Sequence, residues 1–245
     1  YARDSMERFV LTLDALRKRG DIFLEHVASG TPPVLDYDYE IIVDGSHLPR
    51  PCNYMLLKIK APDGVEAKET RRPYVIIDPR AGHGPGIGGF KPDSQVGVAL
   101  KSGHPVYFVA FRPEPYEGQT LANVTHAEAA FLREIMRRHP HAPKPIVVGN
   151  CQGGWATAIL AATNPDLTGP IVLNGSPMSY WSGRIGQDPM RYTGGLVGGV
   201  VPAMLMSDLG GGLFDGADLV LNFESLNPAR TWFRKYYDLY ADIDK

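Results

Sequence analysis

Several features that would assign a protein to a class at once are missing from these 245 residues. The longest apolar stretch, residues 194–206, is broken by glycines and by Pro202, so no run is long enough to cross a membrane. The formal net charge of −2 creates no field that would attract nucleic acid or an anionic membrane surface. We therefore expect no nucleic-acid partner and no membrane span.

Cysteine is scarce as well, since only Cys52 and Cys151 occur. The two could in principle pair, but a disulfide would block Cys151, to which the motif described below gives a reactive role. A reducing, cytoplasmic compartment therefore fits better. The remaining composition, with 44% hydrophobic, 21% charged and 10% aromatic residues, is typical of a globular protein, and 245 residues suffice for one large domain.

Hydrophobic periodicity gives the chain a helical beginning. Apolar residues at helical spacing predict an amphipathic helix over residues 5–27, interrupted near Gly20. Residues 37–43 and 54–59 are then predicted to form two antiparallel strands joined by a loop. Residues 1–36 are accordingly assigned to an N-terminal helical extension.

From here on, short apolar strands alternate with helices. Strands are predicted at residues 74–78, 106–111, 146–148 and 171–174. The helix before the third of these strands ends at His139, and it begins either at Thr120 or near Thr125, which forms a capping box with Glu128. Such alternation predicts an α/β fold with a mostly parallel central sheet and antiparallel strands at its N-terminal edge.

The core domain is predicted to span residues 37–245. Within it, residues 183–216 contain many glycines. We expect this segment to be an irregular excursion over the active edge of the sheet or the start of a cap.

The most informative motif is Gly149-Asn150-Cys151-Gln152-Gly153-Gly154, directly after an apolar strand. A strand that enters a G-x-nucleophile-x-G turn and leaves into a helix is the nucleophile elbow of the α/β hydrolases, here with sulfur in place of the usual serine oxygen. Only glycines at positions 149 and 153 would let the backbone turn so closely, and the turn would expose Cys151. The positive end of the helix dipole would stabilise a thiolate there.

The motif also has two interpretations without a catalytic role. Cys151 could be an inert cysteine in a glycine-rich loop, or the loop could cradle a phosphate. Neither the G-x-G-x-x-G spacing of dinucleotide sites nor the Gly-Lys-Ser/Thr of phosphate loops is present, so the elbow is favoured.

A second glycine-rich stretch, residues 78–90, follows the strand at 74–78. In this fold the corresponding loop donates the second N–H of the oxyanion hole, often through a His-Gly pair. We expect the N–H of Gln152 and an amide near His83 and Gly84 to form that hole, although the glycines could also mark only a flexible loop. His83 as a substitute base is a weaker interpretation.

All seven histidines precede Cys151, at positions 26, 47, 83, 104, 126, 139 and 141. The usual order in this fold is nucleophile, acid and then histidine. The base could lie beyond Lys245 in a longer protein, an earlier histidine could be recruited, or the elbow could be catalytically incomplete. Because only one further strand is predicted after Cys151, we favour a C-terminally truncated domain. His139 and His141 are expected on a solvated helix end, and no metal site is predicted.

The elbow motif resembles the G-x-C-x-G-G box of the polyhydroxyalkanoate synthases. Over essentially its whole length, the sequence is also similar to a poorly characterised branch of synthase-like α/β hydrolases (3-hydroxyalkanoate synthetase-like). The matches lie at residues 72–74, 78–90, 175–181 and 222–228. The resemblance implies catalytic Asp and His partners C-terminal to the residues present here. It also implies an acyl substrate of the hydroxyacyl-CoA or polyester class.

These observations predict an acyl-transfer enzyme in which Cys151 attacks an ester or thioester, without a cofactor. A cysteine acyl-enzyme is itself a thioester, so exchange with an acyl-CoA is nearly balanced in energy, and thioesters are favoured as substrates. The competing interpretation is a non-catalytic scaffold that binds an acyl ligand or a polymer granule. Hydrolysis and polymer synthesis are both compatible with the sequence, and an oligomer is possible.

Overall fold

The computed structural model describes residues 1–80, 86–178, 200–218 and 227–243. Its centre is a sheet in which six strands lie in the order β1-β2-β4-β3-β5-β6. The strands are β1 (Tyr39–Asp44), β2 (Tyr54–Ile59), β3 (Tyr74–Ile77), β4 (Val106–Phe111), β5 (Ile146–Asn150) and β6 (Ile171–Asn174). β1 and β2 run antiparallel to their neighbours, whereas β4, β3, β5 and β6 are mutually parallel. The predicted mixed sheet is thus confirmed.

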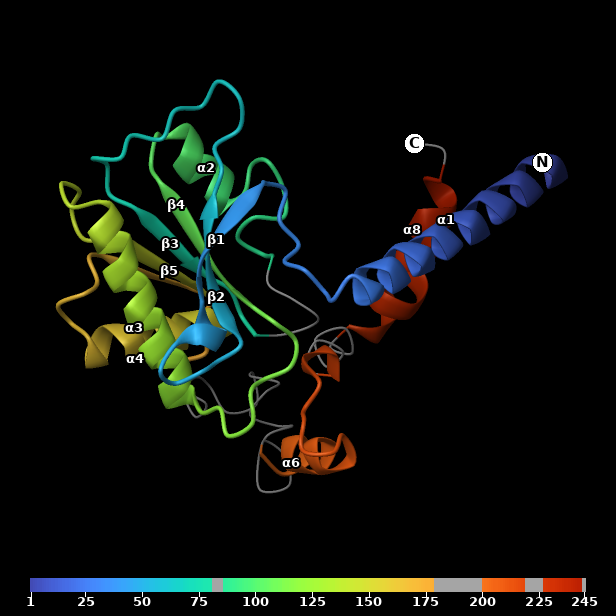
Figure 1. The fold of residues 1–245 in the computed structure, drawn as a ribbon. Helices are drawn as coiled ribbons and strands as arrows, with labels where there is room; N and C mark the ends of the chain where they lie inside the picture. Colours follow the sequence, from blue (N-terminus) through green and yellow to red (C-terminus); the bar gives the residue numbers. More distant parts are fainter. Residues whose placement is uncertain (81–85, 179–199, 219–226, 244–245) are drawn as a thin grey trace.

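Helices cover both faces of this sheet (Figure 1). α3 (Leu121–Arg138) and α4 (Gln152–Thr163) lie over one face, and α2 (Gln95–Lys101) lies over the other. Side chains of alternate residues in β4 point to opposite faces of the sheet. Tyr107 and Val109 pack in the hydrophobic cluster between the sheet and α3, and Phe108 packs in the cluster between the sheet and α2. This period-2 alternation, with both faces buried, explains the continuous apolar runs in the sequence. The architecture is α/β-hydrolase-like.

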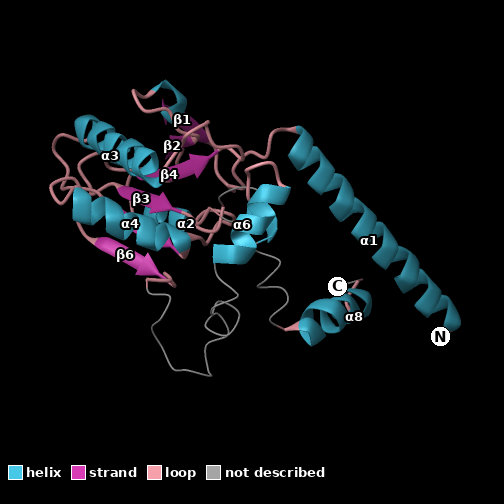
Figure 2. Cartoon of the chain, turned by 90° about the horizontal axis from the view of Figure 1, so that it is seen from below, coloured by secondary structure: helices cyan, strands magenta, loops and turns pink. Residues whose placement is uncertain are grey.

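The N-terminal helix, α1 (Ala2–Ala28), is continuous and has no buried residue. The predicted interruption at Gly20 is therefore wrong: the helix passes through this glycine, where an added Cβ would meet nothing within 4 Å. α1 projects away from the sheet and lies beside α8 (Lys235–Ala241), as Figure 2 shows. Ser5 Oγ and Tyr240 Oη are 2.8 Å apart, and Arg8 Nη1 donates to Ala241 O at 2.9 Å.

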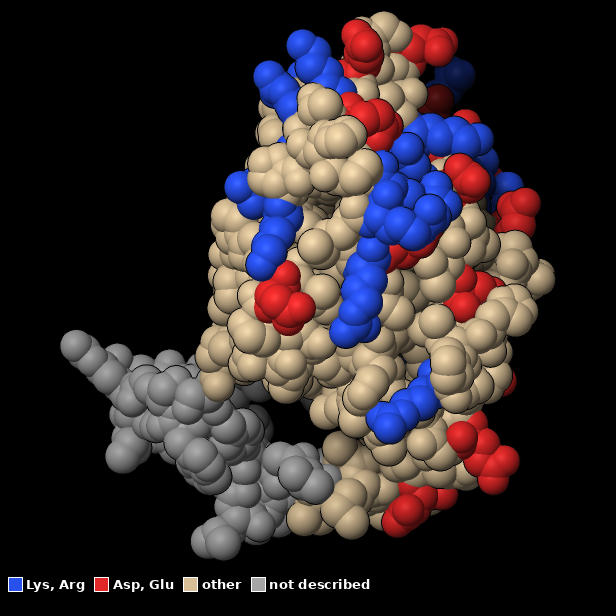
Figure 3. All heavy atoms as spheres, turned by 60° about the vertical axis from the view of Figure 1, so that its left-hand side comes forward, with Lys and Arg blue, Asp and Glu red and all other residues tan. Residues whose placement is uncertain are grey.

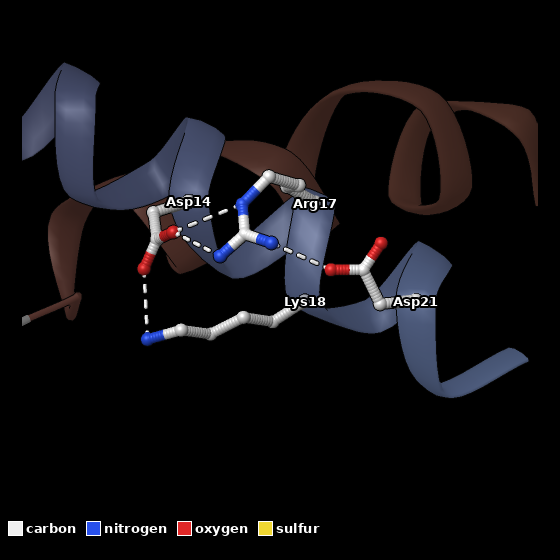
Figure 4. Close-up of polar contacts among 4 residues, drawn as sticks. All are labelled: Asp14, Arg17, Lys18 and Asp21. Carbon is white, nitrogen blue, oxygen red and sulfur yellow. Dashed lines mark hydrogen bonds and ion pairs between the residues drawn. The ribbon is translucent and has the colours of Figure 1, made fainter. Parts of the chain in front are cut away.

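Ion pairs decorate the exposed surface of α1. Asp14 contacts both Arg17 and Lys18, and Arg17 also contacts Asp21 (Figure 4). Such solvated pairs at helical spacing support the helix only weakly. Elsewhere, charges of both signs are interspersed among wide uncharged areas on the face shown in Figure 3, as expected for a chain with little net charge.

Further helical segments follow the sheet. α6 (Val200–Leu209) lies inside the stretch 183–216, for which an irregular excursion or the start of a cap was expected. Residues 183–199 of the same stretch lie outside the described residues. A π-helical turn, η2 (Arg230–Arg234), leads into α8, and a 3-10 turn, η1 (Gly45–His47), follows β1. In the described part of the chain, no helix is both long and apolar enough to cross a membrane.

The start of α3 corrects the predicted capping box. Thr120 is the N-cap and accepts from Asn123 N, whereas Thr125 lies inside the helix and donates to Leu121 O. Glu128 does not cap anything: it is 2% exposed, and its carboxylate oxygens have no partner among the described residues. Burial without a partner raises the pKa of Glu128 to about 8.

The buried Glu128 carboxyl makes stability depend on pH. Its pKa is higher in the folded chain than the ordinary 4.5, so the folded state binds more protons and loses stability as pH rises from about 4.5 to about 8. We expect the free energy of unfolding from urea titrations to fall by about 1.4 kcal/mol per pH unit in that window. Glu128→Gln should remove this slope, while Glu117→Gln, at an exposed position, should keep it. Equal slopes in both variants would contradict the assignment.

Candidate active site

The turn between β5 and α4 holds Cys151 in a strained backbone conformation. Its φ is +50° and its ψ is −117°. Residues other than glycine seldom adopt a positive φ, and those that do are concentrated at functional sites. The backbone is held on both sides, because Cys151 N donates to Asn174 O at 2.8 Å and Cys151 O accepts from Gly154 N at 2.9 Å.

The glycines of the motif are explained by close approach of the backbone. A Cβ on Gly149 would lie 2.5 Å from Gly153 O and 2.5 Å from Thr157 Oγ1. A Cβ on Gly153 would collide with the carbonyl of Ile77 at the end of β3, and one on Gly154 would collide with Ser176 Oγ. Any side chain at these positions would push the elbow away from the neighbouring strands.

The two cysteines lie in opposite environments. Cys151 is half-buried and Cys52 is completely buried, and both are free thiols. Burial raises the pKa of the Cys52 thiol. No hydrogen bond among the described residues involves the Cys151 sulfur. Of the two thiols, Cys151 is thus the one that solvent can reach.

A backbone amide from the neighbouring strand faces the elbow. Arg80 follows the end of β3, and its N–H donates to Gln152 Oε1 at 2.5 Å. Gln152 is the first residue of α4, so its own N–H is among those that a helix leaves without an intrahelical acceptor. The predicted donors His83 and Gly84 lie outside the described residues. Sequence reasoning missed Arg80, although its place just past the carboxyl end of β3 was a usable signal.

The side chain of Arg80 is fixed along its length. Nη1 donates to Asn53 Oδ1 at 3.0 Å, and Nη2 donates to Pro113 O at 3.2 Å. Its guanidinium carbon lies 5.1 Å from the centre of the Phe111 ring and 5.7 Å from that of Tyr54. These contacts hold the segment after β3 against the ends of β2 and β4.

Asp78 ties the glycine-rich segment to the elbow. Its buried carboxylate accepts from the N–H groups of Gly86 and Gly88, both at 3.0 Å, and from Asn150 Nδ2 at 2.8 Å. Burial raises the pKa of Asp78, and these hydrogen bonds partly offset that shift. Because Asn150 directly precedes Cys151, one carboxylate fixes both walls of the candidate site.

Among the described histidines, His104, His126 and His139 form side-chain contacts away from the elbow. His139 was expected on a solvated helix end, but it is 3% exposed, so that expectation is wrong. Its Nε2 lies 2.8 Å from Tyr107 Oη, and its Nδ1 lies 2.8 Å from Glu69 Oε2. This cluster sits where α3 ends, before β5 begins, and not at the carboxyl end where Cys151 lies.

The chain matches the model of one protein family over nearly its whole length. It belongs to DUF3141, a family described as proteins of unknown function, whose model matches residues 4–245. The chain is also 53% identical over 245 residues to a Rhizobium meliloti protein described as an uncharacterized protein in the ackA 5' region. That match covers 100% of this chain and 33% of the relative, so the chain spans about a third of the relative's length.

Solved structures similar to parts of this DUF3141 chain include two enzymes. An inhibited esterase B from Lactobacillus rhamnosis is 12% identical, with a TM-score of 0.44, and the match covers 84% of this chain and 67% of that chain. An alpha/beta hydrolase enzyme from the metagenome of Lake Arreo, Spain, is 17% identical, with a TM-score of 0.43, and the match covers 73% of this chain and 61% of that chain.

The different exposure of the two thiols leads to a direct prediction. Iodoacetamide near neutral pH should label Cys151 at least tenfold faster than Cys52, because the buried thiol must wait for local opening of the fold. Mass spectrometry of tryptic peptides from time points would give both rates, with urea-unfolded protein as the control in which the two thiols react alike. Equal labelling of the folded protein, or labelling of Cys52 alone, would refute the site.

Proposed function

We propose that this chain carries the nucleophile of an acyl-transfer enzyme in which Cys151 attacks the carbonyl of an ester or thioester. The observation that carries the proposal is the geometry of the elbow: a half-buried thiol held at positive φ between a buried strand and a helix N-terminus. Two N–H groups support it as candidate oxyanion donors: that of Arg80, which donates to the Gln152 side chain, and that of Gln152 itself in the first turn of α4.

The chemistry follows from those groups. The Cys151 sulfur forms a bond to the acyl carbon, and the carbonyl oxygen gains negative charge, which the two N–H groups stabilise. Collapse of this intermediate breaks the bond to the leaving thiol or alcohol, which departs with the proton that the Cys151 thiol gave up. Water or an acceptor alcohol then attacks the thioester of Cys151 and releases the acyl group.

Gln152 would have to move during this reaction. Its Oε1 accepts the hydrogen bond from Arg80 N that the substrate oxyanion would accept in the transition state. The amide oxygen therefore stands in for the carbonyl oxygen of a substrate. Rotation of the Gln152 side chain would free the Arg80 N–H for catalysis.

The class of substrate is proposed on chemical grounds. Exchange between an acyl-CoA and Cys151 converts one thioester into another and is nearly balanced in energy, whereas an ordinary ester would be attacked uphill. The similarity of residues 149–154 to the box of polyhydroxyalkanoate synthases supports hydroxyacyl thioesters or polyesters in particular. The catalytic Asp and His that this resemblance implies would lie in the two thirds of the longer relative that this chain does not span.

A second candidate function is a non-catalytic scaffold that binds an acyl ligand or polymer granule. Two observations favour it. The Arg80 N–H already donates to Gln152 Oε1, and none of the hydrogen bonds between described residues joins a histidine to the Cys151 sulfur. Deacylation needs a group that takes a proton from water or alcohol. Without such a group, the site would bind an acyl ligand or become acylated once, and no further turnover would follow.

Pre-steady-state kinetics with p-nitrophenyl butyrate separate these functions. The 245-residue chain should release a burst of at most one nitrophenolate per chain and then continue near the background rate. Cys151→Ala should abolish the burst, and in a full-length protein Cys151→Ser should retain measurable ester hydrolysis, because the backbone donors remain in place. Cys52→Ala is the matched control and should keep the full burst.

A burst that survives in Cys151→Ala would contradict the proposed nucleophile. Absence of any burst in the folded, unmodified chain would favour the scaffold. Sustained turnover that is lost in His83→Ala would show instead that a histidine from earlier in the chain acts as base.

A further inference from the structure

The structure contains a cleft that the proposed reaction does not yet use. Its volume is about 650 Å³, within the range of sites that hold small organic ligands. One wall is the C-terminal end of α1, with Val27 and the following Thr31. The opposite wall is the segment between β4 and α3, which contributes Pro113, Pro115 and Tyr116. The end of α1 that forms the wall is the end nearest the sheet (Figure 1).

The lining is suited to an apolar ligand. Valine, two prolines and a tyrosine present mainly carbon surface. The one guanidinium in the cleft, that of Arg112, is already paired with Asp44 through two hydrogen bonds, 2.9 and 2.5 Å long. A paired cation has little remaining attraction for an anionic ligand, and the Glu114 carboxylate of the lining repels one, so this cleft favours a hydrocarbon chain over an anionic group.

Thr31 is a second unusual feature of the cleft. It has a φ of +49°, which is strained for a β-branched residue, and it is 7% exposed. Its Oγ1 has no hydrogen-bond partner among the described residues. Rotation about the Cα–Cβ bond would exchange this hydroxyl with the methyl group and offer it to an oxygen atom of a bound ligand.

Arg80 links the cleft to the candidate active site. Pro113, which lines it, accepts from the Arg80 side chain, while the Arg80 backbone faces Gln152. The segment that follows Thr31 packs on the glycine-rich loop, because Asp36 N donates to Gly89 O at 2.9 Å. Hydrogen bonds thus join the two segments that line the cleft to the segment after β3, which contacts the elbow.

We infer that this cleft binds the hydrocarbon chain of the acyl group that is transferred to Cys151. The inference rests on the proposed function, since it places the carbonyl end of the chain at the elbow. It adds a selectivity that the elbow alone does not give: short acyl groups leave the cleft empty, and longer ones fill it. Each buried methylene should strengthen binding about fourfold.

The test compares acyl chain lengths in a filled and an unfilled cleft. For acylation of Cys151, p-nitrophenyl octanoate should be preferred over the acetate ester by at least tenfold. Val27→Trp, which places an indole at the cleft wall, should reduce that preference at least tenfold. Val98→Trp, at an exposed position of α2, is the matched control and should keep the preference.

A binding measurement separates this inference from the proposed function. Calorimetric titration of octanoate into Cys151→Ala should show binding that Val27→Trp weakens at least tenfold and that Val98→Trp leaves unchanged. Such binding without acylation of the native chain would refute the proposed function and leave the cleft as a ligand site. Equal octanoate binding in the two tryptophan variants, or a chain-length preference that survives Val27→Trp, would overturn the inference.

Discussion

The constraint on which the candidate site depends is the strained turn at Cys151. Positive φ at a residue with a side chain costs free energy of order 1–3 kcal/mol, so the surrounding structure must hold it in place. Here the backbone is bonded to Asn174 on one side and Gly154 on the other. The tight packing of Gly149 and Gly153 leaves the chain no room to relax. Their bare backbones let a buried strand and a helix meet closely enough to present a thiol.

A second layer of interactions links this turn to the rest of the carboxyl edge. The Asp78 carboxylate gathers the glycine-rich segment and Asn150, and the Arg80 side chain joins β2, β3 and the segment after β4. Because these groups are hydrogen-bonded and largely buried, their positions are mutually dependent. Arg80 also bonds to Pro113, which lines the cleft beside α1, and to Gln152 of the elbow. Specificity and reactivity would therefore be built on one network.

Local patterns were sufficient to predict much of the fold. The strands at 54–59 and 106–111 have the predicted bounds, because uninterrupted apolar runs are bounded by turn residues. The elbow was predictable for the same reason, since its glycines and its strand lie within one short stretch.

The errors arose where distant residues decide the outcome. Thr120 and Thr125 both satisfy a local capping pattern, and the choice depends on the burial of Glu128 in the core. His139 is buried because Tyr107, on a neighbouring strand, bonds to it. The place of Arg80 just past β3 is visible in the sequence, but its contact with Gln152 depends on the pairing of β3 with β5, which no local pattern contains.

The central claim is that Cys151 becomes the acylated residue. Its most direct test is mass spectrometry of the chain after brief incubation with an acyl-CoA, followed by peptide mapping of any added mass. The account predicts one acyl group per chain, located on the peptide that contains Cys151 and removed by hydroxylamine, as expected for a thioester. An added acyl group on Cys52, on a lysine, or in equal amount on Cys151→Ala would contradict it.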